Sequence, residues 1–437
     1  MIRYFSKTAI FLALPIGLAA QETTISLYDA VTIALERNYD VRTASLSRAI
    51  DDNNAEIGNA GLLPTVYLAG SGSYANSDVE TTFNNPEQPP IVADGATTIG
   101  YSGSANLEYL LFNGGKRMHI LNQLQSIGED GRLNERLSLE NTTLNVSNNF
   151  LEVVRLQDQV VIDQETVNLS LDRLDRASQN FQFGNTTRLV LLNAEVDLRT
   201  DSINLAQSQV QYSRALRNLY LSMGVAADTT LGVNGQFDFA ELLDRQAILD
   251  QALGSNTNYL RTRNNLYAAE EGVKAQKAEL FPVLSANAAY QYNYTDYEAN
   301  FLNTQQNSGL SAGLGLRFYV FDGRRIRRNI ENAELERGIA EVSVERSRNQ
   351  VVQLVNNAYD TYITNLSLLQ ISQRNVSLAE LNYERSAEAF ATGQITGIEL
   401  RDAQLNLSNS KNAISRQRVV TKLSEIGLLY EAGLLVK

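Results

Sequence analysis

The sequence predicts a mainly α-helical chain with a β-barrel part, in which long antiparallel coiled-coil helices accompany two β-hairpins. Three observations indicate this fold class. The chain contains two similar copies of one pattern, each copy holds more than fifty consecutive residues without glycine or proline, and each holds segments in which apolar and polar residues alternate. Uninterrupted helical spacing favours long helices, and strict alternation favours strands.

The first residues predict the compartment. Arg3 and Lys7 precede an apolar stretch over 9–20, and a cut before Gln21 would release it. This layout is typical of a secretory signal peptide. A single membrane anchor is the alternative, although the apolar run is short for a helix that crosses a bilayer. We expect a signal peptide over residues 1–20.

Composition excludes several classes of protein. The sequence has no cysteine, which excludes disulfides, thiol nucleophiles, zinc–thiolate sites and a lipid-modified N-terminal cysteine. A formal net charge of -12 predicts no nucleic-acid partner. The one basic run, over 324–328, begins a predicted helix and reads as either a solvated helix face or a membrane-headgroup anchor.

The residues form no recognisable catalytic constellation. The sequence shows neither a glycine-rich phosphate loop nor a nucleophile motif. His119 is its single histidine, so no second histidine could bind a metal ion with it. We expect His119 on the surface. The chain is predicted not to be an enzyme, with no catalytic residues, no metal and no cofactor.

The two copies align residue by residue. Residues 107–114 match 316–323 at a displacement of 209, and further upstream the displacement is 218. The first copy therefore carries nine extra residues, in a proline-containing stretch before residue 107 where an exposed loop is expected. The sequence predicts a first structural repeat over 21–228 and a second over 229–437.

Each copy is predicted to run helix, strand, strand, long helix, helix. The hairpins are expected at about 64–112 and 282–321. Tyrosine-rich strands with one apolar face fit a lipid-facing barrel, and a soluble hairpin with one buried face is the alternative. Four strands cannot close a barrel, which needs about eight, and lipid tolerates no open sheet edge. Several chains would then share one barrel, and three would give twelve strands.

The long helices start after Gly114 and Gly323. Each is expected to run about 65 residues, or roughly 100 Å. This length exceeds that of a globular helix and requires a partner alongside. Gly184 and Gly393 supply hairpin turns, after which a second helix returns as an antiparallel coiled coil.

Several short motifs follow one another in a fixed order along the chain. They are Leu27–Ala30, Ala34–Asn38, Pro64, Pro282, Phe112–Gly114 and Phe321–Gly323. In this order they resemble the TolC-like outer-membrane efflux protein family over essentially the whole mature chain. The resemblance implies a trimer with one twelve-stranded barrel, a twelve-helix periplasmic tunnel and a small mixed equatorial region that includes 229–233.

The resemblance also implies a location and partners. The location is the outer membrane of a Gram-negative bacterium, with the tunnel extending into the periplasm. Besides two further copies of the chain and outer-membrane lipid, the partners are a periplasmic adaptor protein and an inner-membrane pump.

The resemblance implies a pore constriction. The segment 393–402 aligns without gaps to the tip motif whose two carboxylates ring the tunnel entrance, and these are Glu399 and Asp402 here. Spaced i,i+3, they share one helix face, and three chains would bring six carboxylates together. A solvated helix face is the alternative.

The two turns are expected to be the tips on which the adaptor docks, because coiled-coil tips are exposed. The docking residues are Phe183, Gly184, Asn185, Thr392, Gly393 and Gln394. Positions that make a polar lock in the resembled family hold apolar residues, which predicts a more apolar gate. The residues in the vicinity of this gate are Leu189, Val190, Phe390 and Ile395.

The leading function is a passive exit duct of a tripartite efflux system, through which small molecules cross the periplasm and the outer membrane. Two alternatives stay open. The exit duct of a type I protein-secretion system would be the same tube with other neighbours. A surface coiled-coil structural or adhesive protein would explain the helices but not the hairpins placed identically in both repeats.

Overall fold

The computed structural model of the chain forms two compact units, each assembled from three separate segments that come from both sequence copies. Unit 1 consists of Met1–Arg42, Leu139–Leu243 and Asn357–Tyr430, and unit 2 of Thr43–Ser138, Asp244–Asn356 and Glu431–Lys437. The described residues are 23–85, 87–226, 231–240, 244–300 and 302–436. The predicted signal peptide lies outside them, and the repeat boundaries stay a prediction.

Unit 2 carries an antiparallel sheet with the strand order β2-β3-β5-β6. Its strands are β2 (Thr65–Thr81), β3 (Ile91–Phe112), β5 (Val283–Tyr297) and β6 (Thr304–Arg317). The first two occupy the segment predicted as the first hairpin. β6 ends at Arg317, before the predicted limit of 321. The reason is that its neighbour β5 begins at Val283, directly opposite Arg317, and offers no backbone partner beyond it.

The register places apolar side chains of all four strands on one face of the sheet. One row across the strands consists of Leu68, Ala105, Tyr290 and Leu310. A row on the opposite face consists of Ser71, Ser102, Asn293 and Asn307. Leu68 and Leu310 are 82% and 76% exposed in the single chain. An apolar face left this open marks a surface for lipid or protein.

Four helices lie side by side in unit 2, in the order α2, α3, α6, α7. They are most of α2 (Tyr39–Asn54), the first part of α3 (Lys116–Gln182), α6 (Thr257–Lys277) and the first part of α7 (Arg325–Ala391). The ion pairs that join neighbours are Arg48–Glu135 at 2.7 Å, Arg261–Asp130 at 2.9 Å and Lys277–Glu334 at 2.8 Å. α3 and α7 have 67 residues each, close to the predicted length.

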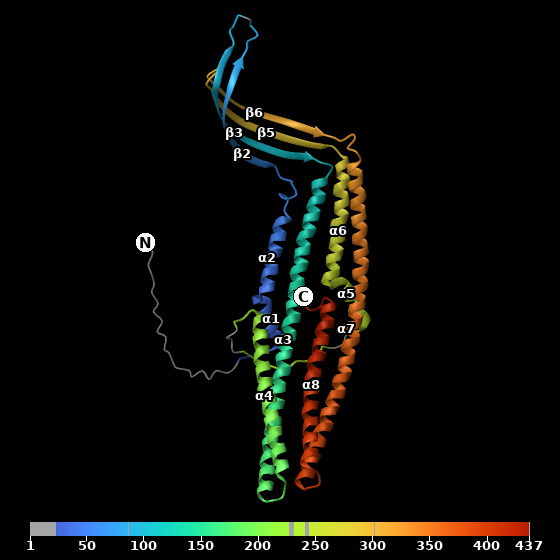
Figure 1. The fold of residues 1–437 in the computed structure, drawn as a ribbon. Helices are drawn as coiled ribbons and strands as arrows, with labels where there is room; N and C mark the ends of the chain where they lie inside the picture. Colours follow the sequence, from blue (N-terminus) through green and yellow to red (C-terminus); the bar gives the residue numbers. More distant parts are fainter. Residues whose placement is uncertain (1–22, 86, 227–230, 241–243, 301, 437) are drawn as a thin grey trace, which may run out of the picture. The chain divides into compact units, whose positions relative to one another are not determined.

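Unit 1 holds a second row of four helices, in the order α4, α3, α8, α7 (Figure 1). α4 (Arg188–Met223) and α8 (Gly397–Glu431) are the returning helices of the two hairpins. α3 contacts α8 through Lys411–Glu165 at 2.7 Å and through a hydrogen bond from Ser415 to Asp158 at 2.6 Å. The largest fully buried side chains along α3 are Val146, Phe150, Leu151 and Val153. None of the helices in the described ranges has the length and hydrophobicity needed to span a bilayer.

Each copy begins with two helices where the sequence predicts one. The pairs are α1 (Leu27–Arg37) with α2, and α5 (Arg245–Ser255) with α6. Asn38 interrupts the first pair: it accepts the backbone N–H of Asp40 at 2.7 Å and donates to the Ser222 carbonyl at 2.8 Å. Asn256 interrupts the second and donates to the Glu431 carbonyl at 2.9 Å. An asparagine that caps one helix and binds the end of another favours a break over a continuous helix.

A glycine lies beside each of these asparagines. Gly224 and Gly433 follow α4 and α8, with φ of 70° and 66°. A Cβ on them would lie 2.5 Å from the Arg37 carbonyl oxygen and 2.4 Å from that of Ser255. Only glycine allows this approach. In unit 1, β1 (Thr23–Ile25) and β4 (Leu231–Val233) add a short parallel pair, which includes the described part of the segment assigned to the equatorial region.

Candidate functional site

The two hairpin turns lie at the same end of unit 1 (Figure 1). Gly184 and Gly393 both have φ of 75°. In the second turn, the N–H of Gly393 donates to the Phe390 carbonyl at 3.0 Å and the N–H of Gln394 to the Ala389 carbonyl at 2.9 Å, and the first turn repeats this pattern. Such a pair of bonds closes a helix around a left-handed residue. A Cβ on either glycine would meet no atom within 4 Å, so only the left-handed backbone conformation favours glycine here.

The residues predicted for adaptor docking form these turns. All six, Phe183, Gly184, Asn185, Thr392, Gly393 and Gln394, are exposed. The predicted gate residues lie beside them: Leu189 and Val190 begin α4 and are exposed, whereas Phe390 and Ile395 flank the second turn and are half-buried. The end of unit 1 therefore presents apolar side chains next to two rigid turns.

The predicted constriction residues lie in the first two turns of α8, and both are exposed. The Glu399 carboxylate accepts the backbone N–H of Thr396 at 2.7 Å and its hydroxyl at 2.9 Å. These hydrogen bonds, the backbone one first, lower the pKa of Glu399. The Thr396 hydroxyl in turn accepts the Glu399 N–H at 3.3 Å, which completes a capping box. Glu399 therefore fixes the start of α8, and Asp402 stands one turn further along the same face.

A buried ion network lies directly behind Asp402. Arg401 donates to both carboxylate oxygens of Asp201, at 2.8 and 2.7 Å, and Asp201 is only 4% exposed. Arg173 forms an ion pair with Asp197 at 3.0 Å, and the Ser170 hydroxyl donates to Asp201 at 2.5 Å. Burial, followed by the charge of Arg401, lowers the pKa of Arg173. Two cations and two anions compensate each other here, and they join α8 to the α3–α4 hairpin.

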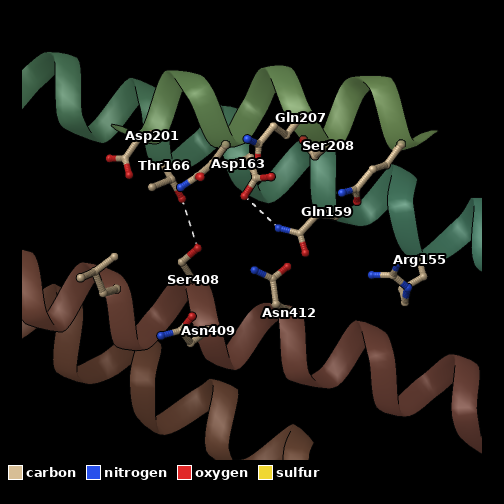
Figure 2. A pocket seen from close by; sticks show the side chains of 13 residues that line it. Arg155, Gln159, Asp163, Thr166, Asp201, Gln207, Ser208, Ser408, Asn409 and Asn412 are labelled. Atoms are coloured by element: carbon tan, nitrogen blue, oxygen red, sulfur yellow. Dashed lines mark hydrogen bonds between the residues drawn. The ribbon is translucent and has the colours of Figure 1, made fainter. Parts of the chain in front are cut away.

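A polar groove of about 340 Å³ adjoins this network, between α3, α4 and α8 (Figure 2). Most of the lining side chains are amides and hydroxyls. Gln159 donates to Asp163 at 2.8 Å, and the hydroxyls of Thr166 and Ser408 lie 3.2 Å apart. Other lining groups bond to the helix backbone or to residues outside the groove, such as Ser208 to the Leu205 carbonyl, and together they form a polar wall along the helices.

Sequence reasoning missed the ion network. A signal for it exists in α4, whose buried residues recur every seven positions as Ala194, Asp201, Ser208 and Ala215. An aspartate inside a buried stripe of small residues requires a cationic partner on a neighbouring helix.

His119, predicted on the surface, is partly exposed at 29% and also contacts a buried carboxylate. Its Nδ1 lies 2.8 Å from Oε2 of Glu271, whose side chain is 3% exposed. Asn122 and Lys274 also donate to this carboxylate, at 2.8 and 2.6 Å. Within the described part of the chain, no group of three or more His, Cys, Asp or Glu residues is arranged to hold a metal ion.

Comparison with known proteins matches this architecture to a family. The family model described as "Outer membrane efflux protein" matches residues 30–225 and 248–429. Among curated proteins, the chain is similar to outer membrane protein TolC of Salmonella enteritidis, with 19% identity over 424 residues that cover 96% of this chain and 83% of TolC. It is also similar to cation efflux system protein CusC of Escherichia coli O157:H7, with 20% identity over 419 residues that cover 92% of this chain and 85% of CusC.

Among solved structures, the Campylobacter jejuni CmeC outer membrane channel matches with a TM-score of 0.79 at 16% identity, covering 100% of this chain and 94% of that chain. This likeness shows the fold. The family match spans most of the chain, including both hairpins and all the long helices. The predicted resemblance and the predicted outer-membrane location are thereby confirmed, and the chain belongs to the outer membrane efflux protein family.

Proposed function

We propose that the chain is the exit duct of a tripartite efflux system. Three copies would form one twelve-stranded barrel and one twelve-helix tunnel, and small molecules would leave passively through it. An inner-membrane pump would supply the driving force, and a periplasmic adaptor would join pump and duct. The duct itself would carry out no chemistry. One observation supports the proposal. Within the described residues, the sheet of unit 2 and the helix row of unit 1 each end, on both sides, in an element that has no neighbour on its outer side.

The sheet of unit 2 has β2 and β6 at its edges. Both strands are long, at 17 and 14 residues, and both are exposed along almost their whole length. In lipid, an unpaired edge would leave a row of backbone N–H and C=O groups without partners. Pairing β6 of one copy with β2 of the next would satisfy these groups and close a barrel with the apolar row outside.

The helix row of unit 1 has α4 and α7 at its edges. The free side of α4 carries an exposed apolar stripe at seven-residue spacing, formed by Leu189, Val196, Ile203 and Val210. The free side of α7 exposes Ile371 and Leu378, which are also seven residues apart. Stripes at this spacing pack against another helix in a coiled coil. The contact that completes the row is therefore α4 of one copy against α7 of the next, and the family resemblance favours three copies over two.

The hairpin turns supply the other assignments within this proposal. Their exposed residues 183–185 and 392–394 would receive the adaptor. Glu399 and Asp402 would face the pore near its periplasmic mouth, and apolar contacts among Leu189, Val190, Phe390 and Ile395 would hold the resting gate.

Crosslinking of chains with introduced cysteines tests the closure, because the sequence has no cysteine of its own. A chain with both Ser71→Cys in β2 and Asn307→Cys in β6 should give a three-chain species with a bismaleimide in detergent. Either single variant can link at most two chains and serves as the control. The trimer should also conduct ions in planar bilayers. A stable monomer without detergent, or a trimer that conducts nothing, would refute the proposal.

A further inference from the structure

An exposed basic and aromatic patch lies where β6 passes into α7, in unit 2. We define it as Phe318, Tyr319, Phe321, Arg324, Arg327 and Arg328. We propose that this patch binds the phosphate headgroups of anionic phospholipid in the outer-membrane leaflet that faces the periplasm. The inference rests on the proposed function, since it requires the sheet of unit 2 to lie in the membrane.

The patch is basic within an acidic protein. Residues 317–331 include five arginines against one aspartate and one glutamate, whereas the whole chain carries -12. Arg327 and Arg328 are 82% and 68% exposed, and both approach the same carboxylate, Glu331. One carboxylate cannot neutralise two guanidinium groups. Guanidinium groups bind phosphate through paired, charge-assisted hydrogen bonds.

The first sequence copy shows that these charges are not needed to start the helix. At the positions that correspond to Arg327 and Arg328 it has Met118 and His119. Its one lysine at this junction, Lys116, is held by Glu279 in an ion pair at 2.5 Å. The other cation of this junction, Arg117, donates to the Gly61 carbonyl at 2.8 Å. Both cations of the first junction therefore have partners within the chain, whereas Arg327 and Arg328 of the second remain largely exposed.

Arg324 provides an independent observation. It is the one non-glycine residue in the described part of the chain with positive φ, at 69°. The corresponding residue of the first copy is Gly115, with φ of 83°. Left-handed backbone is unfavourable for a residue with a side chain, yet within the described residues the Arg324 side chain makes no hydrogen bond or ion pair. An arginine kept in a strained conformation without an internal partner indicates a partner outside the chain.

Aromatic side chains border the arginines on the strand side. Phe318, Tyr319 and Phe321 are 56%, 50% and 82% exposed, and the Arg325 guanidinium lies 6.0 Å from the centre of the Tyr319 ring. Aromatic residues gather where a membrane barrel meets the headgroups, and arginines beside them attract anionic lipid. Along the chain, the strand is followed by the aromatic residues, then the arginines and then the helix. A line from the membrane into the periplasm passes the acyl chains, the interface, the phosphates and the periplasm in the same order.

The test measures lipid retention by the purified trimer in neutral detergent. Native mass spectrometry counts the phosphatidylglycerol and phosphatidylcholine molecules bound per chain. We expect the wild type to prefer phosphatidylglycerol by about tenfold or more, since each of the three arginines near an anionic surface contributes about fivefold. The variant Arg324→Gln/Arg327→Gln/Arg328→Gln should lose this preference. The loss should also appear in the wild type as salt is raised.

A matched control removes the same charge from the same helix, further from the sheet. Arg337→Gln/Arg346→Gln/Arg348→Gln should retain the wild-type preference. A second variant, Arg324→Gly, installs the residue of the first copy. It should bind less phosphatidylglycerol while its thermal midpoint stays equal or rises, because the backbone strain is relieved. A purely structural role of Arg324 predicts no change in lipid retention.

Three results would overturn the inference. The first is an unchanged preference in the triple glutamine variant, or an equal loss in the control. The second is retention of lipid A in place of phosphatidylglycerol through the same arginines, which would place the patch at the opposite leaflet. The third is dissociation of the trimer in the triple variant, which would make the patch a contact between chains. Failure of the proposed function is seen separately, in the crosslinking of wild-type protein in detergent and in its conductance in planar bilayers.

Discussion

Glu271 is a buried carboxylate held by three side chains. Burial alone raises its pKa, but hydrogen bonds from Lys274, Asn122 and His119 outweigh this effect and lower the pKa to about 2. Because the pKa is lowered on folding, Glu271 stabilises the fold above its ordinary value of 4.5, and this contribution is lost as the pH falls toward 2. Glu271→Gln should therefore lower the free energy of unfolding at pH 7 by about 1–3 kcal/mol.

Thermal melts of the purified protein between pH 7 and pH 3 check this prediction. The wild type should lose its advantage over Glu271→Gln as the pH falls from 4.5 toward 3. Glu270→Gln, one residue earlier and half-buried, removes the same charge and should melt like the wild type. A constant difference between wild type and Glu271→Gln across this range would contradict the assignment.

At Gly393, the left-handed backbone disfavours most side chains, although there is space for one. At φ of 75°, valine should cost about 1–2 kcal/mol in the turn, since left-handed backbone disfavours β-branched residues. Gly393→Val should distort the second tip and abolish dye efflux in cells that also carry the cognate pump and adaptor. Trimer assembly should stay normal, because the tip lies outside the helix-edge stripes.

Two controls separate the tip from the substitution. Gly393→Asn should retain efflux, because asparagine tolerates left-handed backbone. Gly338→Val places the same side chain in α7, where a Cβ meets no atom within 4 Å, and should also retain efflux. Wild-type efflux in Gly393→Val would argue against docking at this turn.

At the scale of elements, the ion network decides how α8 is held against the α3–α4 hairpin. Arg401→Leu leaves Asp201 buried without its bidentate partner, and removing one member of such a pair costs about 3–5 kcal/mol. Arg401→Leu/Asp201→Leu removes both charges and should recover most of that loss, because apolar replacement of a whole buried pair is close to neutral. Denaturant unfolding of these two variants and of Asp201→Leu gives the double-mutant cycle. A loss in the double variant equal to the sum of the two single losses would show that the pair is not coupled.

The elements differ in how far the sequence determines them. The long helices could be predicted because glycine is absent between Gly131 and Gly184. Their ends could be predicted because each helix pair turns at a glycine, Gly184 or Gly393, and both glycines adopt left-handed backbone. The end of β6 at Arg317 could not be predicted from the sequence, because it depends on where the partner strand β5 begins. The helix breaks at Asn38 and Asn256 could not be predicted either, because each asparagine donates a hydrogen bond to a carbonyl 175 or more residues away.

Site residues divide in the same way. The two turns could be predicted from the repeated glycines, whereas the pore role of Glu399 and Asp402 rests on alignment and stays a prediction. The capping role of Glu399 follows from Thr396 three residues earlier, which is the spacing of a capping box. The network joins Arg401 of α8 to Asp201, 200 residues earlier in the α3–α4 hairpin, and no local pattern around Arg401 indicates burial.

At the scale of the whole molecule, the proposed trimer completes both the sheet of unit 2 and the helix row of unit 1 with further copies of the chain. The trimer would collect six carboxylates from Glu399 and Asp402 around one constriction. In the single chain, the hydrogen bonds from Thr396, the backbone one first, lower the pKa of Glu399, which opposes the rise that neighbouring carboxylates of a ring would cause. A ring of negative charge attracts cations and binds multivalent cations more tightly than monovalent ones.

Glu399→Gln/Asp402→Asn should therefore reduce the cation selectivity of the trimer in planar bilayers and weaken block by multivalent cations such as a hexammine complex. Glutamine can still accept the Thr396 N–H, so α8 should keep its capped start and trimer stability should change little. The control Glu380→Gln/Glu384→Gln removes two exposed carboxylates from α7 and should leave selectivity unchanged. If the constriction variant assembles, conducts and selects like the wild type, the two carboxylates lie on an outer, solvated helix face and the pore assignment falls.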